Sequence, residues 1–480
     1  MAGSTSKALL WKLLERFGVQ GAQFVLQIIL ARILSPEHYG ALSIMIIFTN
    51  IANVFVQSGF NTALIQKKDV DDRDFSSVFW ASLLIAGVLY TAIYLLSPVI
   101  AGFYNMPEII KPFRVIALML FPGAFNSVQL AKVRRDMNFK KVFVSNVAGI
   151  LIAGGVGIAI AYLGGGLWAL VAQTLLNIAV TCLVMLITVR WFPKLVFDIK
   201  RVGVLLKFGW KLLVSSLIDV VYQDLRSLVV GKKYDSETLG YYTRGKQFPH
   251  FITNAINGTV SAVMLPAMSR EQENRARVKE ITRKSISLGA FIMCPMMAGL
   301  AVCAEPIVTL LLTEKWLPCV PYMQIYCFTM AFLPIHSCNL QAINAVGRSD
   351  IFLKLEIIKK AMGLTTLAIA VIFFDTPIAI AATGIVTTLI SSFINAHPNK
   401  KLIGYSYLEQ IKDMLPAVLT ATLMGALVYL VNFLELRCWV SLLIQIPLGV
   451  ITYVLLSLAF RLKGLREVCK IATKLIKNKD

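Results

Sequence analysis

Residues 167–189 read LWALVAQTLLNIAVTCLVMLITV, a run of 23 positions without a charged side chain. At about 1.5 Å per residue, a helix of this length crosses the roughly 30 Å hydrocarbon core of a bilayer. Similar apolar runs recur from one end of the chain to the other. Barrel strands would instead alternate apolar and polar residues over about ten positions. Because a helix pairs its own backbone groups in lipid, these runs predict an all-α polytopic membrane protein.

Composition supports the same class. Of the 480 residues, 57% are hydrophobic and only 15% are charged, whereas a soluble protein carries about 25% charged residues. The net charge of +21 would suggest a nucleic-acid partner in a soluble protein. Here we assign the basic excess to cytoplasmic loops and to anionic lipid, and expect no nucleic acid. The eight cysteines form no C-x-x-C pair, so we expect neither a metal site nor any cofactor.

Basic residues set the expected orientation. If the N-terminus is cytoplasmic, alternate connections hold 36 of the 47 Lys and Arg residues, as the positive-inside rule requires. We therefore expect both termini in the cytoplasm and about fourteen transmembrane helices, with twelve as the alternative. The N-terminal run has no cleavage site and is expected to be a retained helix. The expected spans are 9–33, 40–60, 76–101, 111–130, 142–163, 167–189, 208–231, 247–268, 286–312, 320–343, 352–373, 377–396, 413–433 and 438–460.

Two halves of the chain share short phrases in the same order. Glu37 matches Glu237 and Gly40 matches Gly240, both 200 residues apart, and later matches are 208 and 212 residues apart. Each half holds an even number of spans, so the repeats enter the membrane from the same side and are parallel. This predicts two lobes around a central cavity. The expected parts are a six-helix lobe at 1–203, a second at 204–403, and two extra helices with a basic amphipathic tail at 404–480.

Polar residues form stripes on the first two spans of each repeat. Polar groups in lipid are costly unless they face protein or water. The stripes therefore either line a hydrated lumen or bond to neighbouring helices; for the four together we favour the lumen. The proposed lumen residues are Arg16, Gln20, Gln23, Gln27, Asn53, Gln57, Lys211, Asp219, Gln223, Arg226, Asn254 and Asn257.

Charges on these stripes indicate an anionic substrate. Arg16 and Arg226 can grip a phosphate through a bidentate fork, so a lipid diphosphate is the simplest ligand. Two alternatives remain open: Arg16 snorkels to the inner interface, or Asp219 and Arg226 form a buried ion pair. Asp219 or Asp224 could instead carry a coupling proton or cation.

Three phrases resemble a known family. Ala31–Gly40 (ARILSPEHYG), Ala304–Leu312 (AEPIVTLLL) and Gln341–Arg348 (QAINAVGR) are similar to phrases of Wzx-type polysaccharide flippases. These belong to the multidrug/oligosaccharidyl-lipid/polysaccharide exporter superfamily. The resemblance covers almost the whole chain, although Tyr234–Glu237 departs from the Leu-x-Pro-Glu phrase of the first repeat.

The resemblance implies a function as well as a fold. It implies two six-helix lobes, alternating access and a monomeric transport unit. The implied substrate is an undecaprenyl-diphosphate-linked oligosaccharide, moved from the cytoplasmic to the periplasmic leaflet of a bacterial inner membrane. Cationic lumen residues, among them Arg16 and Arg226, would hold the diphosphate.

Two other functions compete with a flippase. A membrane polymerase, ligase or glycosyltransferase would need a metal-binding acidic cluster or paired acid and base groups. The one acidic cluster, at residues 69–74, is diluted by basic residues and is expected to be a solvated loop. A small-molecule drug exporter of the same superfamily would need a smaller and more apolar lumen. We therefore expect a transporter and not an enzyme.

Overall fold

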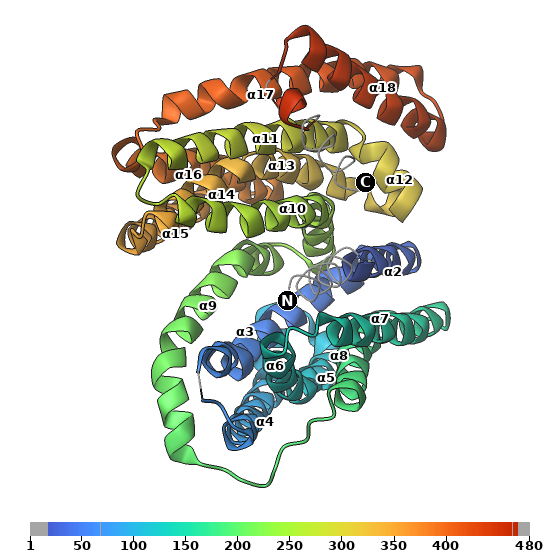
Figure 1. Ribbon diagram of the computed structural model, residues 1–480. Coiled ribbons are helices and arrows are strands. Elements are labelled where there is room, and N and C mark those ends of the chain that lie inside the picture. Colours follow the sequence, from blue (N-terminus) through green and yellow to red (C-terminus); the bar gives the residue numbers. More distant parts are fainter. Residues whose placement is uncertain (1–17, 68, 463, 469–480) are drawn as a thin grey trace, which may run out of the picture. The chain divides into compact units, whose positions relative to one another are not determined.

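A computed structural model describes residues 18–67, 69–462 and 464–468. Within these ranges the chain is helical, and none of the described residues forms a strand (Figure 1). The backbone divides into two compact units, Met1–Thr243 (unit 1) and Arg244–Asp480 (unit 2), and helix α10 (Ser236–Arg270) passes from one to the other.

The other helices precede or follow α10 along the chain. Unit 1 contains α2 (Gln20–Ile33), α3 (Pro36–Gln66), α4 (Asp72–Phe103), η2 (Pro107–Ile109), α5 (Ile110–Ile116), η3 (Ala117–Met119), α6 (Leu120–Arg135), α7 (Phe139–Tyr162), α8 (Leu167–Val189) and α9 (Ile199–Lys233). Unit 2 contains α11 (Arg275–Val302), α12 (Ala304–Leu312), η4 (Glu314–Cys319), α13 (Val320–Ala331), α14 (Leu333–Ala345), α15 (Ser349–Phe373), α16 (Pro377–Leu402), α17 (Tyr407–Tyr429), η5 (Leu430–Leu434) and α18 (Cys438–Ala459).

The all-α polytopic class is confirmed. Each expected span, in its described part, overlaps one of these helices. Among the described residues, ten helical stretches are long and apolar enough to cross a membrane. Helices α2, α9, α10 and α15 are not among the ten. The described part of α2 is only 14 residues long, and charged and polar residues along the other three weaken the signal for a membrane span. The count of fourteen spans therefore stays a prediction.

Small residues let the helices of unit 1 pack closely. On α7, a Cβ atom added at Gly149 would lie 2.4 Å from Thr181 Oγ1 of α8, and one at Gly157 would lie 2.8 Å from Gln173 Cβ. Membrane helices associate through such small-residue contacts because lipid offers little hydrophobic drive for pairing. The glycine-rich face of α7 thus fixes α8 against it.

The repeat seen in the sequence has a counterpart where α3 meets the start of α10. A Cβ atom at Gly40 would lie 1.7 Å from Ser236 O, and one at Gly240 would lie 2.0 Å from Pro36 O. One turn further on, Ser43 Oγ lies 3.4 Å from Thr243 Oγ1, 200 residues away in the chain. Matched positions of the two repeats therefore contact each other, and only glycine fits at the crossing.

Helix α9 packs within unit 1 on α3 and α4. A Cβ atom at Gly209 of α9 would lie 2.4 Å from Gly59 O of α3, so these two backbones are also in close contact. The sequence repeat has its boundary after residue 203, whereas the compact units divide after Thr243. A repeat boundary and a packing boundary are different properties, and the lobes 1–203, 204–403 and 404–480 stay a prediction.

In unit 2, α17 lies along α11. Met414, Ala417, Ala421, Met424 and Val428 are spaced three and four residues apart and are buried in the core of this unit. That spacing places them on one face of α17.

Fully buried amides join further helices of unit 2. Asn339 of α14 donates to Gln410 Oε1 of α17 at 2.7 Å, and Asn399 of α16 donates to Asn339 Oδ1 at 2.7 Å. In this membrane protein, polar side chains thus do bond between helices, as one of the two interpretations of the polar stripes assumes. None of these three amides belongs to a stripe.

Candidate functional site

The stripe on α2 is only partly covered by the structure. Arg16 lies outside the described residues. Gln20, Gln23 and Gln27 are half-buried, and α2 packs on α7. The side-chain oxygen of Gln23 is buried and has no hydrogen-bond partner among the described residues, so this amide keeps an acceptor available.

The stripe on α3 turns toward a neighbouring helix. Gln57 donates to Asn53 Oδ1 at 2.8 Å. A Cβ atom at Gly123 of α6 would lie 3.1 Å from Asn53 Oδ1 and 3.6 Å from Gln57 Nε2, so both amides lie on the α6 backbone. This contact is what interhelical packing predicts, and a lumen role for the two amides stays a proposal.

The stripe on α9 carries the charged candidates. Lys211 and Gln223 are exposed, whereas Asp219, Asp224 and Arg226 are half-buried. Each of the last three takes part in at least one polar or electrostatic interaction. A buried ion pair between Asp219 and Arg226 therefore stays an alternative to a substrate site.

Helix α10 carries a buried arginine that the sequence did not predict as a site residue. Arg244 is 4% exposed, its guanidinium donates to Gln247 Oε1, and it lies 5.4 Å from the centroid of the Trp316 ring. Asn254 is half-buried and has a polar partner, and the side chain of Asn257 is not among those described. Arg244 precedes Gln247 by three residues and Asn254 by ten, so helical periodicity extended toward the N-terminus would have added it to the stripe.

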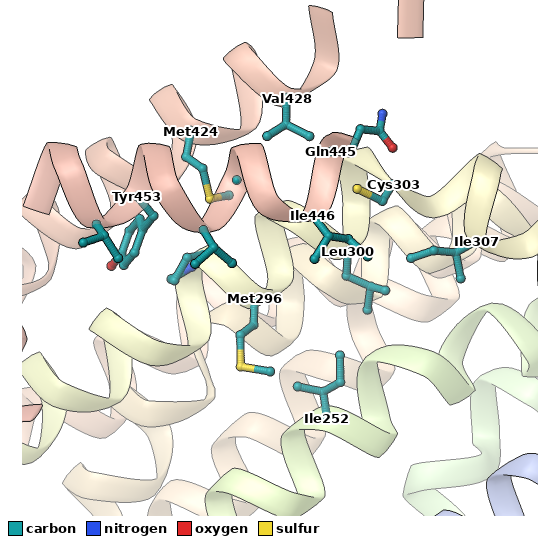
Figure 2. A pocket seen from close by; sticks show the side chains of 15 residues that line it. Ile252, Met296, Leu300, Cys303, Ile307, Met424, Val428, Gln445, Ile446 and Tyr453 are labelled. Atoms are coloured by element: carbon teal, nitrogen blue, oxygen red, sulfur yellow. The ribbon is translucent and has the colours of Figure 1, made fainter. Parts of the chain in front are cut away.

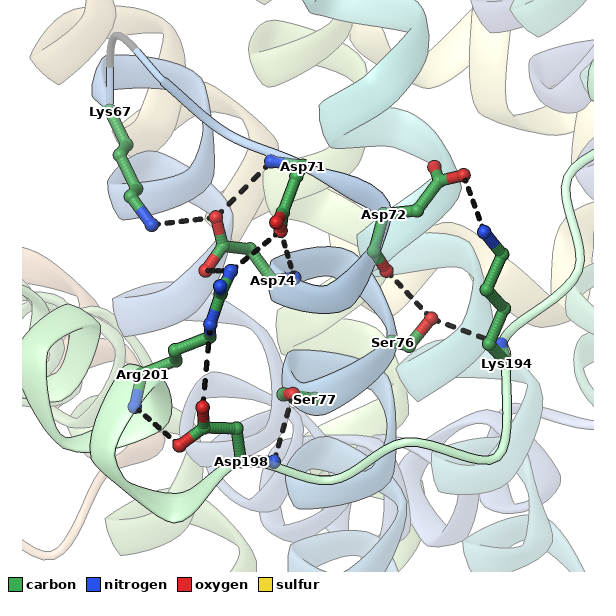
Figure 3. Close-up of polar contacts among 9 residues, drawn as sticks. All are labelled: Lys67, Asp71, Asp72, Asp74, Ser76, Ser77, Lys194, Asp198 and Arg201. Atoms are coloured by element: carbon green, nitrogen blue, oxygen red, sulfur yellow. Dashed lines mark hydrogen bonds and ion pairs between the residues drawn. The ribbon is translucent and has the colours of Figure 1, made fainter.

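The acidic segment between α3 and α4 is not simply a solvated loop (Figure 3). Asp71 and Asp72 are exposed, but Asp74 is fully buried. Asp74 lies 2.6 Å from Lys67 Nζ and 3.2 Å from Arg201 NH1, which also pairs with Asp71 at 2.8 Å. We call these four residues (Lys67, Asp71, Asp74 and Arg201) the unit 1 ionic cluster.

The carboxylates of the unit 1 ionic cluster are already paired with cations of the same cluster. The backbone N–H of Asp74 and the guanidinium of Arg201 hold the pKa of Asp71 below its ordinary value. Asp72 in turn lies 3.4 Å from Lys194 Nζ (Figure 3). These ion pairs connect the start of α4 to the start of α9. Because the carboxylates are paired with cations of the chain, they do not point to a catalytic metal site.

Unit 2 has a corresponding cluster with the charges exchanged. Lys279 of α11 lies 3.0 Å from Glu409 of α17, and Arg283 lies 2.7 Å from Asp413. We call these four residues the unit 2 ionic cluster. In unit 1 the acids lie at the start of α4, the helix of the third expected span, and the arginine lies on α9, the helix after the sixth. In unit 2 the cations lie near the start of α11 and the acids on α17, so the signs are reversed.

Unit 2 also contains an apolar pocket of about 500 Å³ between α10, α11, α12, α17 and α18 (Figure 2). Met296, Leu300, Met424 and Ile446 are among its lining residues. At one end, Gln445 donates to Asn432 Oδ1 at 2.6 Å, while its own side-chain oxygen is buried and has no partner among the described residues. The chemistry of this pocket suits a hydrocarbon chain.

A second pocket, of about 630 Å³, lies in unit 1 and has a different character. We call it the α6–α8 pocket. It is lined by Ile65, Asn126, Leu130, Arg134, Phe139, Val142, Asn146, Thr181 and Met185. None of these residues was predicted from the sequence, because the polar ones among them lie on α6, α7 and α8, outside the spans on which polar stripes were expected.

These helices define a polytopic all-α membrane protein. A solved structure of the lipid II flippase MurJ, in an inward closed conformation, superposes with a TM-score of 0.76 at 17% identity, covering 94% of this chain and 99% of MurJ. An inward-facing multidrug resistance MATE family transporter of the MOP superfamily gives a TM-score of 0.62 at 16% identity, covering 81% and 98%.

The chain belongs to the polysaccharide biosynthesis protein family, whose sequence model matches residues 29–321. The succinoglycan biosynthesis transport protein ExoT of Rhizobium meliloti is 24% identical over 71% of this chain and 69% of ExoT. The teichuronic acid biosynthesis protein TuaB of Bacillus subtilis is 24% identical over 63% of each chain. The lipopolysaccharide biosynthesis protein WzxC of Escherichia coli is 21% identical over 84% of this chain and 82% of WzxC. The resemblance to Wzx-type proteins is thereby confirmed.

Proposed function

We propose that this protein is a flippase that moves a polyprenyl-diphosphate-linked oligosaccharide across the bacterial inner membrane by alternating access. The family match over residues 29–321 carries the proposal. Relatives named as a transport protein and as WzxC support it, as does the fold shared with a lipid II flippase. Both termini would lie in the cytoplasm, and the monomer would be the transport unit.

The parts of the substrate match parts of the chain. The apolar pocket of unit 2 would hold part of the polyprenyl chain, because Met296, Leu300 and Ile446 offer it hydrocarbon contacts. Arg226 and Arg16 would hold the diphosphate while the lobes move, and the polar stripes would line the path of the sugar. Asp219 or Asp224 would exchange a coupling proton or cation.

A membrane enzyme is the alternative function. The observation against it is that Asp71 and Asp74 are occupied by Arg201 and Lys67. A drug exporter is less consistent with the names of the relatives, which refer to polysaccharide biosynthesis.

The test is transport of a diphosphate-linked lipid in vesicles that contain matched amounts of each variant. We expect Arg226→Ala and Arg226→Lys both to lose transport, since lysine keeps the charge but not the bidentate fork. Lys207→Ala, which removes an exposed cation of the same helix outside the proposed lumen residues, measures how much of the loss follows from charge alone. Wild-type transport by Arg226→Ala would overturn the assignment of Arg226, and absence of transport by the native chain would overturn the function.

Topology is tested separately. A reporter that is active only in the cytoplasm, fused after Asp480, should be active. A reporter that is active only in the periplasm and gives signal at the same position would contradict the orientation or the even number of spans.

A further inference from the structure

The three cations at the end of α6 have different surroundings. Arg135 donates to the backbone oxygen of Lys67 at 2.7 Å, and so covers the end of α3. Lys132 lies 3.8 Å from Asp72 and faces α4. Arg134 is exposed and lines the α6–α8 pocket, and its guanidinium has no hydrogen-bond or ion-pair partner among the described residues. Of these three, Arg134 is the one whose charge is directed to a pocket.

Three polar side chains line the same pocket further from the helix ends. Asn126 precedes Arg134 by eight residues, Asn146 follows the start of α7 by seven, and Thr181 precedes the end of α8 by eight. At 1.5 Å per residue, all three lie roughly 10–14 Å from the ends of their helices. The pocket therefore has a cationic mouth and a polar floor at one depth.

The floor has unused hydrogen-bonding groups. The side-chain nitrogen of Asn126 donates to Ile178 O at 3.4 Å, but its side-chain oxygen is buried and lacks a partner among the described residues. The side chain of Asn146 has no hydrogen bond within the described part of the chain. Thr181 donates to Ser145 O at 3.4 Å, a long bond. A buried acceptor without a partner is costly, so a ligand that supplies hydroxyl groups would be stabilised beside the Asn126 oxygen.

We infer that the α6–α8 pocket binds the headgroup of a lipid diphosphate, with the phosphates at Arg134 and the first sugar at the amides of Asn126 and Asn146. The inference rests on the proposed function, and gives it a headgroup site away from the polar stripes. A guanidinium at the mouth suits phosphate through charge-assisted hydrogen bonds. Apolar walls at Ile65, Val142 and Met185 leave the amides as the groups that select a hydroxylated ring over a bare diphosphate.

Binding to the full-length protein in detergent tests the site. The probes are farnesyl diphosphate, the same lipid carrying one N-acetylglucosamine, and inorganic diphosphate. Arg134→Ala and Arg134→Lys should weaken both lipid probes by about tenfold, as expected for the loss of one charge-assisted contact. Asn146→Ala should weaken only the glycosylated probe. Lys132→Ala, which removes an equal charge two residues away, should leave both unchanged, and thermal unfolding checks that each variant is folded.

Several outcomes overturn the inference. If Lys132→Ala weakens binding as much as Arg134→Ala, the effect is general electrostatic attraction. If Asn146→Ala weakens both lipid probes equally or neither, the sugar does not reach the floor. If inorganic diphosphate binds as tightly as the lipids, the site takes free phosphate. A native protein that binds in the expected pattern but does not flip lipid would overturn the proposed function and leave the site standing.

Discussion

The close contact of α3 with α10 leads to a quantitative prediction. A methyl group at Gly40 would lie 1.7 Å from Ser236 O, and real Cβ atoms essentially never approach closer than 3.0 Å. Gly40→Ala must therefore move the two backbones apart by about 1.3 Å. Overpacking of this kind costs about 1–3 kcal/mol. We expect the melting temperature of the variant in detergent to fall.

A matched glycine separates this effect from helix propensity. A Cβ atom at Gly87 of α4 meets nothing within 4 Å, so Gly87→Ala should be neutral or stabilise by up to about 1 kcal/mol. Cysteines at positions 43 and 243, where the native oxygens are 3.4 Å apart, supply a second measurement. Ser43→Cys with Thr243→Cys should cross-link readily beside Gly87→Ala and slowly beside Gly40→Ala, as measured by mass spectrometry of the joined peptides. Equal stability and equal cross-linking in the two backgrounds would refute the reasoning.

The ionic clusters supply two further predictions. Asp74→Asn should lower the melting temperature more than Asp72→Asn does, because Asp74 is fully buried between Lys67 and Arg201 whereas Asp72 is exposed; equal effects would contradict this. The backbone N–H of Ser406 and the ammonium of Lys279 lower the pKa of Glu409 to about 2. This stabilisation is present above the ordinary pKa of 4.5 and is lost as pH falls toward 2, so Glu409→Gln should be less stable than the native protein at pH 7 but nearly equal to it near pH 2.

The sequence predicted the helices well because their signal is local. Any apolar run such as residues 167–189 has one stable solution in a bilayer, and it coincides with α8. The match of Gly40 with Gly240 also identified two residues that the structure brings into contact. The number of membrane spans was harder to predict, since α9 and α10 carry polar faces and hydropathy alone does not decide whether they cross the membrane.

The sites were less predictable because they depend on contacts between distant segments. Periodicity selected Asn53 and Gln57, but it does not reveal that Gly123 of another helix lies beneath them. It did not select Asn126 or Asn146, since polar stripes were expected only on the first two spans of each repeat. The burial of Asp74 depends on Arg201, 127 residues away, and no local pattern contains that information.

The exchanged charges of the two ionic clusters also bear on how the chain assembles during synthesis. Two homologous repeats in one membrane could exchange partners, so that α4 took the place of α11 beside α17. That pairing would bring the acids of the unit 1 ionic cluster against Glu409 and Asp413 of α17. The opposite error would bring Lys279 and Arg283 of α11 against Arg201 of α9. Like charges at the same contact repel, so each mistaken pairing is rejected by electrostatics while each correct one is attracted. The reversal of sign thus disfavours each exchanged pairing of these helices by charge repulsion.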